Sequence, residues 1–374
     1  MSPREDEPES RRPRRLSGVA GRGRLRQVVR AAVSLGLAAA IFAYVLGSVA
    51  DVSEVGRAIS SMTGLELATL GLAAVWNIVT YWMVVMAATP GLTYRQAMVL
   101  VESTTAVANA VPGGSAVAVA LSYNMLGSWG FSGSRTTLSV VVSGLWNNFA
   151  KLGMPVLALA LVALQGDVTP ARLTAALLGV GVLVASVTVF ALALRKEAFA
   201  RRAGDVAAAW ATRLRAAVGK GAVEGWGDAT VKFRARTIGL VRHAWARLTV
   251  VTLLSHFSLY LVLLLSLRHI GVSNDEVHWA EILAVFAFVR LLTAIPITPG
   301  GLGVVELGLV AGLTAAGGDE AGVVAAVLVF RALTYLVQIP FGLVTYLFWR
   351  RNSSWRNSAP PSTLEPARAG TRPG

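Results

Sequence analysis

Several stretches of this chain are apolar over lengths that match the thickness of a lipid bilayer. Residues 171–194 and 248–267 are clear examples, and each can cross the ~30 Å hydrocarbon core as a helix. Charged residues make up only 14% of the chain, whereas soluble globular proteins carry roughly 25%. These features argue against one large soluble enzyme and against a disordered chain. They predict an all-α polytopic membrane protein.

We expect about six full transmembrane helices. They cover residues 28–49, 65–88, 136–164, 171–194, 248–270 and 321–349. The first run exceeds the roughly 7–15 residues of a signal-peptide core, so we interpret it as an uncleaved anchor. Residues 1–27 and 350–374 are polar and predict disordered tails that flank a transmembrane domain over 28–349. The basic segment 195–247 also carries aromatic residues, which is typical of interfacial helices on an anionic leaflet, or it is an ordinary connector.

Two further apolar stretches contain helix breakers. Pro112, Gly113 and Gly114 interrupt residues 97–126. Residues 280–317 are interrupted by Pro296 and by a second Pro-Gly-Gly triplet, which is Pro299, Gly300 and Gly301. Proline removes a helical hydrogen bond and glycine adds backbone freedom, so each stretch should be broken there. Each is either one kinked span or a re-entrant hairpin.

The distribution of basic residues favours hairpins. Of 34 Lys and Arg, nine lie in residues 1–30, twelve in 195–247 and five after residue 349. Basic loops mark the cytoplasmic side, and this places both flanks of 97–126 inside and both flanks of 280–317 outside. About 28 basic residues then lie inside and three outside. The sequence therefore predicts eight apolar segments, two of them oppositely oriented re-entrant helical hairpins, with both termini cytoplasmic.

The same assignment gives the chain an internal symmetry. The chain thus contains two repeat units, a first unit over residues 65–164 and a second unit over residues 248–349. Each unit contains a helix, a hairpin with a Pro-Gly-Gly tip and another helix, and the two units have opposite orientation. Inverted repeats with broken helices near the bilayer centre are typical of secondary transporters. Two unrelated kinked helices are the alternative.

Five ionisable residues fall inside apolar stretches: Glu102, Lys151, Arg290, Glu306 and Arg331. Such residues are costly in a bilayer and usually pair or line a polar path. Complete pairing would leave one cation over, which suits an anionic headgroup, and Arg290 and Arg331 are the favoured residues because each has at least nine residues of mostly apolar sequence on either side. Neutral groups along the same path would include Asn109 and Asn148, with Ser115 and Asn147. The alternative is a set of structural salt bridges.

Several classes of chemistry have no support in the sequence. The chain has no cysteine, and its four histidines are scattered, so we expect no metal site. It contains no P-loop, HExxH or nucleophile elbow, so we expect no cofactor and no enzyme activity. The basic residues lie in membrane flanks, which argues against a nucleic-acid partner.

The run from Thr298 to Leu309, with Arg290 before it and Arg331 after it, resembles a signature of the lysylphosphatidylglycerol synthetase transmembrane-domain family. The stretches 111–116 and 146–151 resemble the pattern of that family's first half. The resemblance covers roughly residues 30–350 and implies a flippase-like membrane protein that moves lipids between leaflets. The known members with synthase activity carry a soluble domain, and we expect none here because only a polar tail follows residue 349.

These observations leave two hypotheses open. The first is a flippase-like transporter in a bacterial inner membrane, for an anionic or aminoacylated phospholipid or a polyprenyl-linked lipid. The second is a non-transporting scaffold or accessory subunit of an envelope-lipid pathway. Expected partners are membrane lipids, a second copy of the chain or an envelope-lipid enzyme.

Overall fold

The computed structural model describes residues 57, 59–110, 113–164, 170–216, 225–294, 298–352 and 355, and every regular element that these residues form is a helix. The helices are α3 (Gly64–Ala88), α4 (Tyr94–Ala110), α5 (Gly114–Ser128), α6 (Gly133–Ala163), α7 (Pro170–Arg195), α8 (Glu197–Ala216), α9 (Trp226–Ile270), α10 (Trp279–Leu292), α11 (Val304–Ala315), α12 (Glu320–Arg331) and α13 (Gln338–Arg351). The all-α prediction is confirmed for these residues.

Five helical stretches are long and apolar enough to cross a membrane. They are Gly64–Ala88, Gly133–Ala163, Ala176–Arg195, Trp226–Ile270 and Glu320–Arg351. They coincide with five of the six predicted spans, and the sixth, residues 28–49, lies outside the described residues. A polytopic membrane protein is therefore supported.

Local capping explains where the first helix of each broken unit begins or ends. The hydroxyl oxygen of Thr63 accepts from the Glu66 amide at 3.3 Å, and the Glu66 carboxylate accepts from the Thr63 amide at 2.7 Å, so a capping box opens α3. Helix α9 ends at Gly271, whose φ of 107° stops the helix. Its 45 residues exceed one bilayer crossing, because at 1.5 Å per residue they reach about 67 Å. The expected span 248–270 is thus the C-terminal half of a longer helix.

Both Pro-Gly-Gly sites interrupt a helix, as predicted. Helix α4 ends at Ala110 and α5 begins at Gly114, after Gly113 with a φ of 68°. The second interruption is longer, because α10 ends at Leu292 and α11 begins only at Val304. A 3₁₀ turn, Pro299–Gly301, lies between them. Helix α4 packs against α5, and α10 packs against α11.

The last apolar run contains a change of helix type. A π-helical turn, Ala332–Leu336, joins α12 to α13, and the Val337 amide donates to the Ala332 carbonyl at 3.0 Å. Pro340 follows one turn later and has no amide hydrogen to donate. Such π turns are frequent at functional sites. This one follows Arg331 directly.

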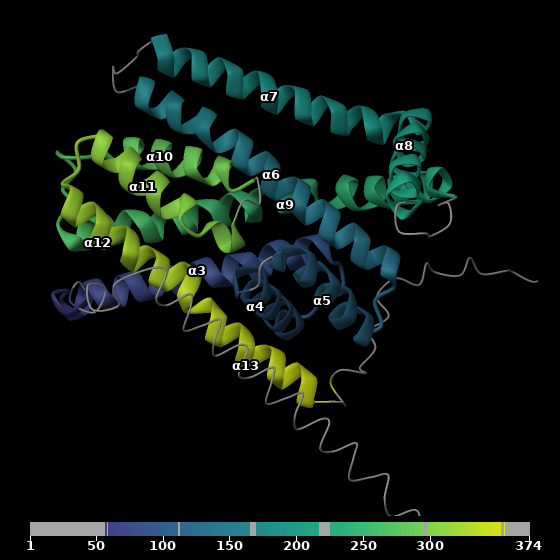
Figure 1. The fold of residues 1–374 in the computed structure, drawn as a ribbon, viewed down its shortest axis with the longest axis horizontal. Helices are drawn as coiled ribbons and strands as arrows, with labels where there is room; N and C mark the ends of the chain where they lie inside the picture. Colours follow the sequence, from purple (N-terminus) through teal and green to yellow (C-terminus); the bar gives the residue numbers. More distant parts are fainter. Residues whose placement is uncertain are drawn as a thin grey trace, which may run out of the picture. The chain divides into compact units, whose positions relative to one another are not determined.

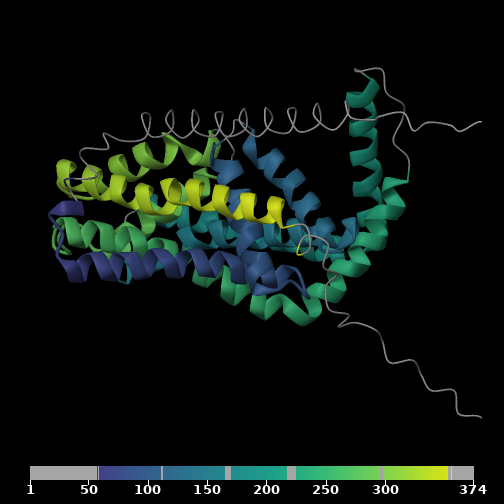
Figure 2. The same ribbon diagram turned by 90° about the horizontal axis from the view of Figure 1, so that it is seen from below.

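The two units contact each other in a reciprocal way. Their first helices, α3 and α9, pack along each other (Figures 1 and 2). Helix α4 of the first unit packs against α13 of the second, and α10 of the second packs against α6 of the first. The first helix of each interrupted pair therefore packs against the last helix of the other unit.

Candidate functional site

A cavity of about 400 Å³ lies inside the helix bundle, and both units contribute to its wall. The first unit provides residues of α3 to α6, and the second provides residues of α9 to α13 with the 3₁₀ turn. Its polar and glycine lining residues are Asn77, Tyr81, Glu102, Thr105, Asn109, Ser115, Asn147, Lys151, Arg290, Thr293, Thr298, Gly300, Gly301, Arg331, Thr334, Tyr335 and Gln338. The structure therefore brings most of the predicted site residues to one space.

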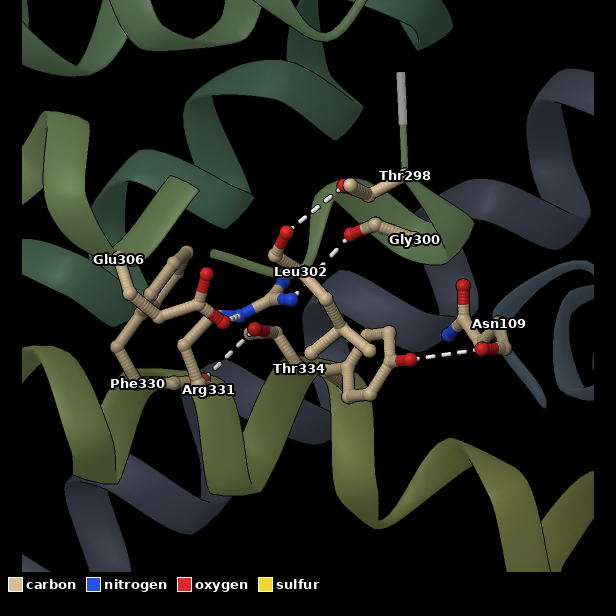
Figure 3. A network of polar contacts seen from close by, with 9 residues as sticks. Asn109, Thr298, Gly300, Leu302, Glu306, Phe330, Arg331 and Thr334 are labelled. Atoms are coloured by element: carbon tan, nitrogen blue, oxygen red, sulfur yellow. Dashed lines mark hydrogen bonds and ion pairs between the residues drawn. The ribbon is translucent and has the colours of Figure 1, made fainter. Parts of the chain in front are cut away.

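Arg331 is the centre of a polar network at the second helix break (Figure 3). Its Nε donates to Oε1 of Glu306 at 2.6 Å, and its Nη2 donates to the carbonyl of Gly300 at 3.2 Å. The guanidinium also lies over the ring of Tyr335, 4.4 Å from the ring centre. Glu306 is in the first turn of α11, so one guanidinium ties α12 to α11 and to the 3₁₀ turn. This ion pair is of the kind that the alternative hypothesis expected, a structural salt bridge, and Glu306 compensates the charge of Arg331.

The second break also contacts the first. Tyr335 donates its hydroxyl hydrogen to the carbonyl of Asn109, near the end of α4, at 2.7 Å (Figure 3). Gly300 has a φ of 58°, and a Cβ atom there would overlap the Tyr335 ring and lie 2.9 Å from the Asn109 side-chain oxygen. Only glycine tolerates both the backbone conformation and the close approach. The two interruptions therefore meet at Asn109, Gly300 and Tyr335.

Lys151 and Arg290 line the same cavity without an acidic partner. Lys151 is buried in α6, and its Nζ donates to the Thr293 carbonyl at 3.4 Å. Arg290 is in the last turn of α10, and its Nε is buried without a hydrogen-bond partner. Within the described part of the chain, no carboxylate lies at ion-pair distance from either side chain. The wall formed by α6 and α10 therefore carries two uncompensated basic groups.

Glu102, which could have neutralised one of them, is bonded elsewhere. Its side chain is 1% exposed, and Oε1 accepts from the indole nitrogen of Trp82 at 2.6 Å. Oε2 is buried and has no hydrogen-bond partner. Complete pairing of the five ionisable residues would leave one basic residue without an acidic partner. In the structure two basic residues, Lys151 and Arg290, have none, because Glu102 accepts from an indole instead.

The remaining predicted residues occupy different places. Asn148 is exposed on α6, and its neighbour Asn147 lines the cavity, because successive helical residues point in different directions. A Cβ on Gly114 would overlap the backbone oxygen of Val107, within its own helix pair. Pro112 lies outside the described residues.

Sequence reasoning missed Trp82 and Tyr335 as site residues. Tyr335 follows Arg331 by four positions, which is the spacing that places two side chains on one helix face. Nothing in the sequence marks Trp82 as the partner of Glu102. In the described ranges, no group of three His, Asp or Glu residues could hold a metal ion.

Comparison with known proteins supplies the family. The lysylphosphatidylglycerol synthase transmembrane region matches residues 28–342, which is most of the chain. The UPF0104 membrane protein MJ1078 of Methanocaldococcus jannaschii is 40% identical over 62 residues, and this match covers 17% of the chain and 26% of the relative. The chain belongs to the lysylphosphatidylglycerol synthase transmembrane-region family.

Proposed function

We propose that the protein moves a lipid with an anionic headgroup between the two leaflets of a bacterial inner membrane. The observation that carries the proposal is the pair Lys151 and Arg290, two basic groups on one cavity wall with no acidic partner at ion-pair distance among the described residues. A phosphodiester in the cavity would neutralise one of the two positive charges and accept hydrogen bonds from both side chains. The proposal involves no chemical step.

The cost of burying these cations supports a ligand. A basic residue at the centre of a membrane helix costs roughly 2.5–3.5 kcal/mol on insertion scales. Hydrogen bonds to Glu306 and Gly300 and the contact with the Tyr335 ring offset this cost for Arg331. The buried Nε of Arg290 has no hydrogen-bond partner. Arginine binds phosphate through a planar fork and stays charged when desolvated. We therefore assign headgroup binding to Arg290 and Lys151. Arg331 instead holds the 3₁₀ turn in place through its hydrogen bond to Gly300.

The packing of the two units supports alternating access to this cavity. The first helix of each interrupted pair, α4 or α10, packs against the last helix of the other unit. Inverted-repeat transporters use such an arrangement, with one half rocking against the other around a central site. The proposal includes the topology derived from basic residues, with two re-entrant pairs and cytoplasmic termini.

A leaflet-exchange assay tests the proposal. The purified protein is reconstituted into vesicles that contain fluorescent phosphatidylglycerol or fluorescent phosphatidylcholine, and a membrane-impermeant quencher reports the outer-leaflet fraction over time. Arg290→Met and Lys151→Met should each slow exchange of phosphatidylglycerol roughly tenfold or more, because a charge-assisted hydrogen bond contributes about 1.5–3 kcal/mol. Arg242→Met is the matched control, since Arg242 is exposed on α9 and does not line the cavity.

Two outcomes would contradict the proposal. Exchange that is unchanged in both cavity variants would show that the lipid does not pass Lys151 and Arg290. Absence of exchange in the wild-type protein, together with phosphatidylglycerol binding that requires Arg290, would favour the scaffold function.

A further inference from the structure

Helix α8 is held across the end of α7 by the first part of α9. The guanidinium of Arg234 donates to the Leu194 carbonyl at 2.9 Å and to the Arg195 carbonyl at 3.2 Å, so α9 fixes the corner at which α7 ends. Figures 1 and 2 show that α8 then runs across the direction of α7. Because α7 contains a candidate membrane span that ends at Arg195, a helix that runs across this end lies along the bilayer surface.

One face of α8 is covered by α9. Ala200 and Ala208 are buried on this face, and a Cβ on Gly204 would overlap the carbonyl oxygen of Trp226. These three residues follow one another by four positions, so they share one side of the helix. The close approach of the two backbones fixes the rotation of α8 about its own axis.

The carboxylates of α8 also lie toward α9. Arg201 forms ion pairs with Glu197 of α8 and with Asp228 of α9. The Asp205 carboxylate lies beside Gly227 of α9, where an added Cβ would overlap it. Negative charge is therefore kept on the side of α8 that α9 covers.

The opposite face of α8 has no partner of this kind. It carries three apolar and two basic side chains, which are Phe199, Arg202, Val206, Trp210 and Arg213. They follow one another by three or four positions and therefore share one side of the helix. The three apolar residues are 43%, 52% and 61% exposed in chain order. The Arg213 guanidinium lies over the Trp210 ring, 5.8 Å from its centre, and within the described residues neither arginine has an acidic partner at ion-pair distance.

This combination of side chains fits a negatively charged lipid surface. Aromatic and aliphatic side chains of an interfacial helix enter the boundary between headgroups and acyl chains, and basic residues attract anionic lipids. The aliphatic part of an arginine follows the apolar surface while its guanidinium stays at the level of the phosphates. A second copy of the chain would present the same positive face, and like charges oppose such a contact.

We infer that the exposed face of α8 binds the anionic lipids of the leaflet at which α7 ends. Phe199, Val206 and Trp210 enter the headgroup region, and Arg202 and Arg213 select anionic over zwitterionic lipids. The inference goes beyond the proposed function, because it holds whether or not the protein moves a lipid.

Electron paramagnetic resonance of the full-length protein, at one copy per nanodisc, tests the inference. The chain has no cysteine, so Val206→Cys carries a single spin label at the centre of the exposed face. Oxygen concentrates in the lipid and a nickel chelate stays in water, so their effects on the label report its depth. In nanodiscs with phosphatidylglycerol the label should be shielded from the chelate. In nanodiscs of phosphatidylcholine alone the chelate should reach it more readily.

A label on α9 is the matched control. Ala229 is exposed and follows Gly227 by two residues, which places it about 200° around the helix from the side that packs on α8. The label in Ala229→Cys should stay accessible to the chelate in both kinds of nanodisc.

Charge variants in the Val206→Cys background test the lipid selectivity. Arg202→Gln and Arg213→Gln should each lower the ratio of shielded to accessible label about fivefold in phosphatidylglycerol nanodiscs, the effect of one basic residue near an anionic surface. High salt should act in the same direction, because it screens exposed charges. Arg236→Gln is the matched control, since Arg236 is exposed on α9 outside this face, and it should leave the ratio unchanged.

Three results would overturn the inference. The first is equal access of the chelate to the labels at 206 and 229 in phosphatidylglycerol nanodiscs. The second is shielding at 206 that is the same in phosphatidylcholine and unchanged in both arginine variants, which would indicate an apolar contact without lipid selectivity. The third is shielding that appears only with two copies per nanodisc, which would make this face an interface between copies. None of these results affects the proposed headgroup site at Lys151 and Arg290.

Discussion

At the scale of single residues, Gly300 and Gly113 separate two reasons for glycine at a helix break. Both have positive φ, 58° and 68°. A Cβ on Gly113 would meet nothing within 4 Å, whereas one on Gly300 would overlap Tyr335 and approach Asn109. The first position requires glycine for its backbone conformation alone, and the second requires it also for space.

This difference gives a matched pair of variants. Gly113→Ala should lower the free energy of unfolding by about 1–2 kcal/mol, the cost of a left-handed conformation for a residue with a Cβ. Gly300→Ala should cost more, because overpacking adds about 1–3 kcal/mol. Thermal unfolding in detergent, followed by tryptophan fluorescence, measures both. Equal losses in the two variants would mean that the contact between the breaks is not tight.

The Arg331–Glu306 pair predicts a compensation. Arg331→Ala leaves a buried carboxylate and should cost about 3–5 kcal/mol of stability. Glu306→Gln in the same protein removes that charge and should recover most of the loss. The measurement is the same unfolding experiment on both single variants and the double variant. Failure of the double variant to recover would show that Gly300 or Tyr335, and not Glu306, holds the guanidinium in place.

Among the elements, the interrupted helix pairs α4–α5 and α10–α11 raise two separate questions. One is where the helix stops, and the other is which side of the membrane each pair faces. The sequence predicted both interruptions correctly, since Pro-Gly-Gly lacks an amide hydrogen and has high backbone freedom. Basic residues predicted which side of the membrane each pair faces. Labelling from one side of the membrane tests that second prediction.

The chain has no cysteine, so in a single-cysteine variant a maleimide can label only the introduced residue of this protein. Thr93→Cys and Ser132→Cys flank the first pair, and Asp275→Cys and Glu320→Cys flank the second, all at exposed positions. A membrane-impermeant maleimide added outside the cell should label 275 and 320 and leave 93 and 132 unlabelled until the membrane is opened. Labelling of 93 and 132 from opposite sides would make α4 and α5 one kinked span.

At the scale of the whole molecule, stability depends on packing between the two units. Gly342 of α13 lies against α4, and a Cβ there would overlap the Glu102 carbonyl oxygen. This contact between the units therefore lies at the backbone of Glu102, one of the residues that line the cavity.

Gly342→Ala should separate α13 from α4 and lower the melting temperature. Gly144→Ala is the matched control, since Gly144 is an exposed helical position with nothing within 4 Å of its added Cβ, and alanine favours a helix. The control should be neutral or slightly more stable. A loss in Gly342→Ala no larger than in the control would mean that the units can move apart there without cost.

Local sequence signals predict where most of the described membrane helices lie and where two of them are interrupted. Hydropathy over about 20 residues predicts membrane helices because each run must match the bilayer, and prolines and glycines predict where helices stop because their effect is local. The same reasoning identified Glu102, Lys151, Arg290 and Arg331 as unusual, because a charge within an apolar run is visible without a partner.

Which of these charges are compensated depends on packing between helices that are distant in the sequence. Arg331 pairs with Glu306 across two helices, whereas Glu102 bonds to Trp82 of α3, and the sequence contains no periodic or local signal for either choice. The rotation of α6 places Asn147 on the cavity and Asn148 on the outside, although the two are neighbours. These outcomes depend on how helices distant in the sequence pack against one another, and that packing sets which side chains share a space and which charges are left without a partner.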